Sequence, residues 1–132
     1  MKTVIRAFFR TLRIELGPVM LQKERLTRPA AIQRAPAAQS AVDLQCQSLV
    51  LYQFSTCPFC IKVRQEMHRL ALPIELRDSQ NNSTHRSELQ QGSGGTQVPC
   101  LKITDSNGQT RWLKESSAIV AYFRERFAAP AA

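Results

Sequence analysis

Two cysteines separated by two residues, Cys57-Pro-Phe-Cys60, are the side chains of this sequence best suited to chemistry. The apolar run Leu49–Phe54 before them predicts a buried strand, and a helix is expected over Pro58–Leu72 because proline suits the first helical position. Cys57 would then cap that helix, where free backbone N–H groups and the helix dipole favour a negatively charged sulfur. Cys60, one turn further in, lies close enough to form a disulfide with it. We therefore expect Cys57 to attack a substrate sulfur and Cys60 to resolve the product.

A zinc site and a coincidental pairing both account less well for the two cysteines. Half of a zinc site would need two more ligands, and a coincidental pair would not produce the strand–C-x-x-C–helix context that a redox site requires. Lys62 and Arg64, within the next turn or so, would add positive potential around the sulfurs. The other candidate zinc ligands are Cys46, Cys100, His68 and His85. No two of them are close enough in the sequence to form a second ligand pair.

Two further motifs have the chemistry of a peptide-binding site. A cis Val98–Pro99 bond would turn the backbone of Val98 toward Cys57, so that an extended peptide-like substrate could pair with it as an added strand; an ordinary trans turn proline is the commoner alternative. Ser116, at the start of the last predicted helix, could hold a carboxylate through its N–H and hydroxyl groups, and Glu115 could hold an ammonium group. Together they suit the zwitterionic end of an amino acid, although alone they would be a capping motif.

The remaining elements must place these motifs together. The order β-α-β-α-β-β-α predicts a mixed sheet covered by helices, with the first two strands parallel. After the first strand and helix, we expect a strand at 73–77, a helix from Ser83 or Thr84 to Gln91, strands at 101–104 and 110–113 around the turn at 105–108, and a last helix capped by Ser116 or Ser117.

Composition bounds the class of protein. The length of 132 residues and the hydrophobic fraction of 43% are typical of one globular domain with an extension. The net charge of +8 is unevenly distributed along the chain. Residues 1–34 hold eight cations against two anions, whereas residues 35–132 hold ten against eight. No apolar run approaches the ~18 residues of a membrane-spanning helix. Four cysteines are too few for a disulfide scaffold.

The basic excess belongs to an N-terminal arm. Residues 1–16 predict an amphipathic helix that Gly17-Pro18 should end, with one apolar face formed by Ile5, Phe8, Phe9, Leu12 and Leu16. Such a helix could lie on an acidic membrane surface, or dock on its own domain or on a partner, and the pattern does not choose between these. A secretory signal is disfavoured because arginines interrupt the apolar stretch, whereas a transit peptide stays open if the source is a eukaryote.

The expected domain organisation has three parts. Residues 1–41 form the basic arm and a linker, because 28–41 contain two prolines, many alanines and no apolar period. Residues 42–128 form the globular α/β domain, and 129–132 form a loose tail.

The motifs occur in the order and spacing of a known family. The segments Leu51-Tyr-Gln-Phe-Ser-Thr-Cys-Pro-Phe-Cys60, Gly95-Thr-Gln-Val-Pro99 and Trp112-Leu-Lys-Glu-Ser-Ser-Ala-Ile119 resemble those of a glutaredoxin. The Gln-Val-Pro and Glu-Ser elements look more like the glutaredoxin-like first domain of glutathione S-transferases, although we do not expect a second helical domain and therefore do not expect a full transferase. The resemblance covers about residues 47–127. It implies a thioredoxin-like (glutaredoxin) α/β fold with a mixed four-stranded sheet and flanking helices, to which this chain adds the basic N-terminal arm.

The resemblance also implies roles for individual residues, with glutathione as co-substrate and with no tightly bound cofactor or metal. Cys57 matches the nucleophile that forms a mixed disulfide with glutathione, and Cys60 matches the resolving cysteine. The expected glutathione contacts are Val98 and the cis-proline Pro99 for the cysteinyl segment, Glu115 and Ser116 for the γ-glutamyl end, and Arg86 for the glycine carboxylate.

Some positions depart from the family or lie outside its pattern. Phe54 stands where many glutaredoxins have a lysine. Binding of the glycine carboxylate of glutathione would therefore depend on Arg86, Lys62 or another cation. Cys100 is expected to be buried, away from the site or in the core. Cys46 could be an exposed thiol open to glutathionylation, and the sequence does not decide this.

The expected function is that of a glutathione-dependent thiol–disulfide oxidoreductase acting on disulfide-bonded or glutathionylated proteins. Two rivals stay open: a carrier of a [2Fe–2S] cluster held by Cys57 of two protomers and two glutathiones, and a membrane-recruited binding module in which residues 1–16 do the main work. Nucleic-acid binding is not expected, because the charge lies in a short arm without a recognition motif. Cysteines beside a glutathione site suit a reducing compartment, so we expect the cytoplasm, with peripheral contact at the inner membrane face as an option.

Overall fold

The centre of the fold is a four-stranded sheet. The computed structural model describes residues 17–127. The strands are β1 (Leu49–Gln53), β2 (Glu75–Asp78), β3 (Cys100–Thr104) and β4 (Thr110–Lys114), in the order β2-β1-β3-β4. β1 and β2 are parallel, as predicted, and the β3–β4 hairpin adds two antiparallel strands. The chain therefore has the expected thioredoxin-like α/β fold.

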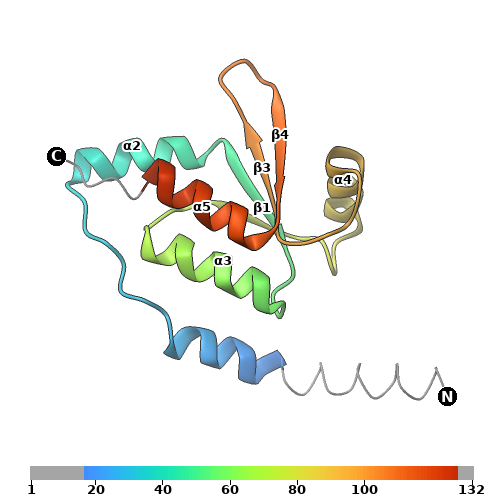
Figure 1. Ribbon diagram of the computed structural model, residues 1–132, viewed down its shortest axis with the longest axis horizontal. Helices are drawn as coiled ribbons and strands as arrows, with labels where there is room; N and C mark the ends of the chain where they lie inside the picture. The colour runs from blue at the N-terminus through green and yellow to red at the C-terminus, as the bar shows by residue number, and fades with distance from the viewer. Residues whose placement is uncertain (1–16, 128–132) are drawn as a thin grey trace.

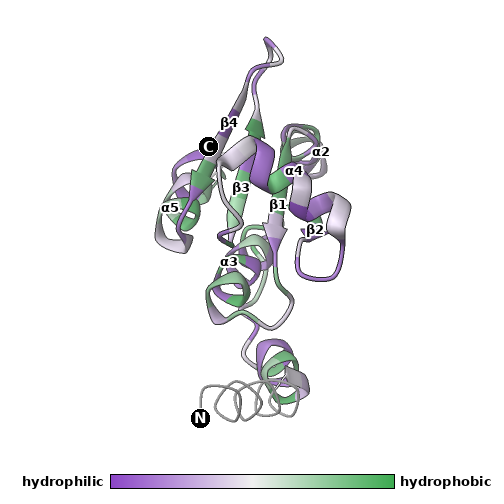
Figure 2. Ribbon diagram, turned by 90° about the vertical axis from the view of Figure 1, so that its right-hand side faces the viewer, coloured by the Kyte–Doolittle hydropathy of each residue, from purple (hydrophilic) through white to green (hydrophobic). Residues whose placement is uncertain are grey.

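Helices cover both faces of this sheet. α3 (Pro58–Arg69) and α5 (Ser116–Phe127) lie side by side on one face, and α4 (Ser83–Ser93) lies on the other (Figures 1 and 2). Alternate residues of each strand point to opposite faces. Leu51 and Leu101 therefore join the larger core beneath α3 and α5, whereas Tyr52 and Cys100 join a smaller cluster beneath α4.

The segment 28–41 is not a simple linker. α2 (Pro36–Cys46) begins inside it, so the prediction was wrong for residues 36–41. Alanine has the highest helix propensity and Pro36 occupies the first turn, so this segment forms a helix without a strong apolar period. Arg34, just before α2, donates to the carbonyl oxygens of Leu70 (2.6 Å) and Phe127 (3.0 Å), at the C-terminal ends of α3 and α5. The segment is thereby fixed to the domain.

The described part of the N-terminal arm is helical as well. Residues 17–26 form a helix, so Gly17 and Pro18 are themselves helical. Whether a helix over 1–16 ends at these two residues stays a prediction, because residues 1–16 lie outside those described. The fixed φ of proline suits the first turn of a helix, where its missing N–H donor has little cost. The predicted helix over 1–16 and the tail at 129–132 lie outside the described residues. Among the helices of residues 17–127, none is long and apolar enough to cross a membrane.

α4 is held on its face of the sheet by polar and aromatic contacts. The Tyr52 hydroxyl donates to Glu88 of α4 (3.0 Å) and accepts from Arg77 of β2 (2.8 Å). The helix continues to Ser93, two residues beyond the predicted end, and Gly94 ends it with a left-handed φ of 82°. Gly92 lies against the indole ring of Trp112, and a Cβ at this position would overlap that ring.

A Gly→Ala change within a helix usually stabilises a protein, but at Gly92 we expect it to lower stability because of the contact with Trp112. We expect Gly92→Ala to lower the free energy of unfolding by about 1–3 kcal/mol, because overpacking against Trp112 outweighs the gain in helix propensity. Gly95→Ala is the matched control, since a Cβ there meets open space; it should change stability by no more than about 0.5 kcal/mol. Urea unfolding followed by circular dichroism measures both. A Gly92→Ala protein as stable as the control would show that the indole ring can move aside freely.

Candidate functional site

The register of the sheet brings three loops to one end. Cys100, the first residue of β3, pairs with Tyr52 near the end of β1 and with Lys114 at the end of β4. The loop after β1, the loop before β3 and the turn after β4 therefore leave the sheet at the same end, which we call the cysteine end. Parallel pairing of β2 with β1 adds a fourth segment, the β2–α4 loop, at this end.

Cys57 occupies the predicted position at the N-cap of α3. Its backbone is extended (φ −85°, ψ 126°), Pro58 follows in the first turn, and its carbonyl oxygen accepts a hydrogen bond from Ile61 N–H (2.9 Å). The side chain is half-buried, and the neighbouring Phe59 is 63% exposed. Within residues 17–127, no α3 backbone N–H forms a capping hydrogen bond to the sulfur. Cys57 therefore lies half-exposed at the N-terminus of a helix.

Cys60 is fully buried one turn into α3. Its sulfur accepts a hydrogen bond from Phe54 N–H, with a nitrogen–sulfur distance of 3.5 Å. Burial, reinforced by the adjacent Cys57, raises the pKa of Cys60 to about 12, while the Phe54 N–H and the positive charge of Arg64 act in the opposite direction. Cys60 is therefore a protonated thiol at neutral pH, in hydrogen-bonding contact with the Cys57 side chain.

The loop before β3 has the predicted cis Val98–Pro99 bond. Pro99 is buried, and Val98 is half-buried against the cluster beneath α4. Since β3 starts next to the end of β1, this loop lies at the same end of the sheet as Cys57. Whether the Val98 backbone pairs with a substrate stays a prediction.

The turn between β4 and α5 differs in detail from the prediction. α5 begins at Ser116, and the capping position belongs to Glu115, whose carbonyl oxygen accepts from Ile119 N–H (3.1 Å). β4 runs to Lys114, so a single residue makes the turn, and Glu115 does so with a φ of 71°. The expectation that Ser116 or Ser117 caps the helix was therefore wrong. The Glu115 side chain is exposed and Ser116 is half-buried, both at the cysteine end.

Arg86 lies in the first turns of α4. Its guanidinium donates to the carbonyl oxygens of Ser79 (3.0 Å) and Gln80, and so ties the helix to the β2–α4 loop. These contacts use part of its donor capacity inside the protein. Lys62 of α3, the other cation considered for a substrate carboxylate, is exposed.

The other two cysteines do not belong to the site. Cys46 is 1% exposed at the end of α2, and burial raises its pKa to about 11. Cys100 is fully buried, as expected, and burial raises its pKa too. The structure therefore excludes an exposed thiol at Cys46.

Sequence reasoning missed the partners of Arg64. It anticipated a positive charge near the cysteines, but not that this guanidinium binds Gln53 at the end of β1 and Glu24 in the arm. Glu24 is 40 residues away in the sequence, so no local pattern could have joined the two.

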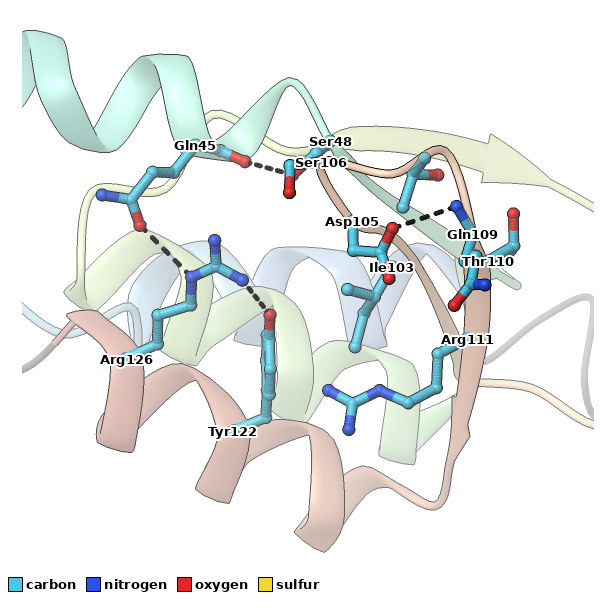
Figure 3. A pocket seen from close by; sticks show the side chains of 11 residues that line it. Gln45, Ser48, Ile103, Asp105, Ser106, Gln109, Thr110, Arg111, Tyr122 and Arg126 are labelled. Atoms are coloured by element: carbon cyan, nitrogen blue, oxygen red, sulfur yellow. Dashed lines mark hydrogen bonds between the residues drawn. The ribbon is translucent and has the colours of Figure 1, made fainter.

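A large cavity lies at the opposite end of the sheet (Figure 3). Its volume is about 820 Å³, and it lies between the β3–β4 hairpin and α5, where Arg111, Tyr122 and Arg126 contribute to its wall. Its lining residues, all within the described part of the chain, include no cysteine or histidine. The cavity is therefore separate from the cysteine end.

Comparison with known proteins places the chain in a family. Residues 51–131 match the family model of the glutathione S-transferase N-terminal domain. A solved maleylacetoacetate isomerase from Anaeromyxobacter dehalogenans 2CP-1 is 27% identical with a TM-score of 0.48, and the match covers 64% of this chain. Oxidised glutaredoxin 2 from Chlamydomonas reinhardtii is 22% identical over 67% of this chain and 80% of its own, with a TM-score of 0.45. A buckwheat glutaredoxin–glutathione complex is 17% identical over 71% and 86%, with a TM-score of 0.48.

The chain corresponds to part of the isomerase, whereas the family domain takes up most of the chain. The match spans 39% of the length of the isomerase. The family model covers more than half of the present chain and runs from within β1 to the end of α5, with the whole cysteine end. The chain belongs to the family of glutathione S-transferase N-terminal domains, with a glutaredoxin-like thioredoxin fold.

Proposed function

We propose that the protein is a glutathione-dependent thiol–disulfide oxidoreductase. The observation that carries this proposal is the pairing of an accessible Cys57 at the N-cap of α3 with a buried Cys60 one turn behind it. A helix N-terminus stabilises a thiolate, which is the attacking species in disulfide exchange. Membership of the glutathione S-transferase N-terminal domain family supports glutathione as the co-substrate.

The reaction begins with attack of the Cys57 thiolate on the glutathione sulfur of a glutathionylated protein. The Cys57–glutathione disulfide forms as the original disulfide breaks, and the released protein thiolate takes up a proton. A second glutathione then attacks the glutathione sulfur, which returns Cys57 as a thiolate and releases oxidised glutathione. For a protein disulfide, Cys57 forms a mixed disulfide with the substrate, and Cys60 attacks Cys57 to release it.

The other segments at the cysteine end would bind the tripeptide. The backbone of Val98 before β3 pairs with the cysteinyl part as an added strand, beside Pro99. Glu115 and Ser116 hold the ammonium and carboxylate groups of the γ-glutamyl end, where the start of α5 favours an anion. Arg86 or Lys62 would neutralise the glycine carboxylate.

Substitution of each cysteine separates their roles. We expect Cys57→Ser to reduce glutathione-dependent deglutathionylation of a mixed-disulfide substrate by at least about a hundredfold, because the nucleophile is lost. Cys60→Ser should retain that activity and lose reduction of protein disulfides through the dithiol route. The assay couples formation of oxidised glutathione to a reductase. Wild-type activity in Cys57→Ser would remove Cys57 from the mechanism, and full dithiol activity in Cys60→Ser would remove Cys60 from the resolving role.

Burial predicts the order in which the thiols react. In the native reduced protein at neutral pH, iodoacetamide should modify Cys57 more than about tenfold faster than any other cysteine, because Cys46, Cys60 and Cys100 are buried and burial raises the pKa of each. Peptide mass spectrometry at timed quenches gives the four rates. Urea-unfolded protein is the control, in which the four rates should converge. Equal labelling of Cys57 and a buried cysteine in the native protein would contradict the assignment.

A further inference from the structure

The described part of the arm packs beside the helix that carries the cysteines. We call residues 17–28 the arm segment; its helix runs alongside α3 in both views (Figures 1 and 2). A Cβ at Gly17 would lie 3.3 Å from the Thr56 methyl, immediately before Cys57, and Gln65 of α3 donates to the Thr27 hydroxyl (3.0 Å). The arm segment lies outside the residues that match the family. Its contacts with the redox region are therefore not part of the matched family domain.

The central contact is an ion pair between Glu24 and Arg64. Arg64 Nε donates to one carboxylate oxygen (3.0 Å) and Nη2 to the other (2.7 Å), which is a bidentate arrangement. The side chains are 12% exposed for Arg64 and 9% exposed for Glu24. A buried bidentate pair fixes the guanidinium plane, which an exposed pair would not do.

The remaining donors of Arg64 hold the loop that leads to Cys57. Nη1 donates to the side-chain oxygen of Gln53 and to the carbonyl oxygen of Phe54 (3.3 Å), and Nη2 also donates to the carbonyl oxygen of Ser55 (2.7 Å). With the two bonds to Glu24, these contacts match the five N–H donors of a guanidinium.

The Phe54 backbone connects this arginine to both cysteines. Its carbonyl oxygen accepts from Cys57 N–H (3.4 Å) as well as from Arg64, and its N–H donates to the Cys60 sulfur (3.5 Å). The residue that contacts the Cys60 sulfur is therefore itself held by the Arg64 guanidinium.

We propose that Arg64 is a positioning residue for the resolving step, and that Glu24 of the arm segment sets its orientation. The inference rests on the proposed function and adds the arm to the redox site. Cys60 must lose its proton and approach Cys57 for resolution, and the Phe54 N–H and the Arg64 charge both favour its thiolate. Among the bonds described above, Cys57 contacts this network only through its backbone N–H, whereas its attack uses the sulfur at the N-cap of α3.

The step concerned is an internal disulfide exchange. The Cys60 thiolate attacks the Cys57 sulfur of the Cys57–glutathione disulfide, the bond to glutathione breaks, and the Cys57–Cys60 disulfide forms. Glutathione leaves as a thiolate and takes up the proton that Cys60 gave up. The two protein thiols are thereby oxidised in the overall sequence, and the glutathione disulfide is reduced.

The test separates the two steps in the full chain. Reduced protein is mixed with oxidised glutathione and quenched with acid at timed intervals, and intact-mass spectrometry follows the Cys57–glutathione adduct and its conversion to the internal disulfide. The test variants are Glu24→Gln, Arg64→Gln and Arg64→Lys. Two controls are Thr27→Val, which removes another contact of the arm segment with α3, and Glu75→Gln, which removes a distant carboxylate paired with Arg77.

We expect the adduct to form in all proteins at rates within about twofold of wild type. Its conversion should slow by about tenfold in Arg64→Gln, because the charge-assisted hydrogen bonds to the loop are lost. It should slow by at least about threefold in Glu24→Gln, because the guanidinium is no longer held by a carboxylate. Arg64→Lys should also be slow, since an ammonium group cannot reproduce the bidentate and loop contacts together. Both controls should convert like wild type.

Three outcomes overturn the proposal. Wild-type conversion in Glu24→Gln would show that the arm segment does not set Arg64, full rescue by Arg64→Lys would show that charge alone suffices, and equal slowing by Thr27→Val would indicate general loosening of the arm. Thermal unfolding monitors folding, and Glu24→Gln keeps the test valid if Arg64→Gln does not fold. A wild-type protein that forms no adduct at Cys57 would instead refute the proposed function itself.

Discussion

β3 pairs on one side with β1 and on the other with β4, and the site depends on this double pairing. Cys100 is level with Tyr52 and with Lys114, so the chain must leave β1, enter β3 and leave β4 at one end of the sheet. A strand shifted by one residue would also turn its side chains to the wrong face. Leu51 and Leu101 would then leave the core beneath α3 and α5. The same apolar contacts that stabilise the fold therefore hold the cysteine end together.

Burial divides the chemistry between the two sulfurs of the motif. Cys57 stands at the N-cap of α3, between the end of a strand and the first hydrogen-bonded turn of a helix, and it is half-buried. Cys60, three residues later, has already entered the core, and its pKa is raised to about 12. One sulfur is thus suited to attack and the other to remain protonated until a mixed disulfide has formed beside it.

The parts of the fold that follow from local sequence patterns could be predicted. The apolar run before Cys57, the proline after it and the Asp105–Gly108 turn each act over a few residues, and the predicted strands and helices occur in the predicted order. α2 could not be anticipated from periodicity, because its alanine-rich sequence has a helical preference but a weak apolar face. Its attachment depends on Arg34, whose partners at Leu70 and Phe127 lie far along the chain.

Of the candidate site, the residue types and their grouping could be predicted, but the contacts between distant segments could not. The Glu24–Arg64 pair is specified by how the arm segment packs against α3, which no spacing in the sequence encodes. The left-handed turn at Glu115 arises because β4 extends to Lys114 and leaves one residue to reverse the chain.

The central claim is that the loops at the cysteine end form one binding site for glutathione. The most direct measurement is a titration of uniformly ¹⁵N-labelled reduced protein with S-methylglutathione, an unreactive analogue, followed by amide chemical shifts. The account predicts saturable shifts for Cys57, Val98 and Ser116 with a common dissociation constant. Shifts confined to the cavity between the β3–β4 hairpin and α5, or no saturable shifts at the cysteine end, would contradict it.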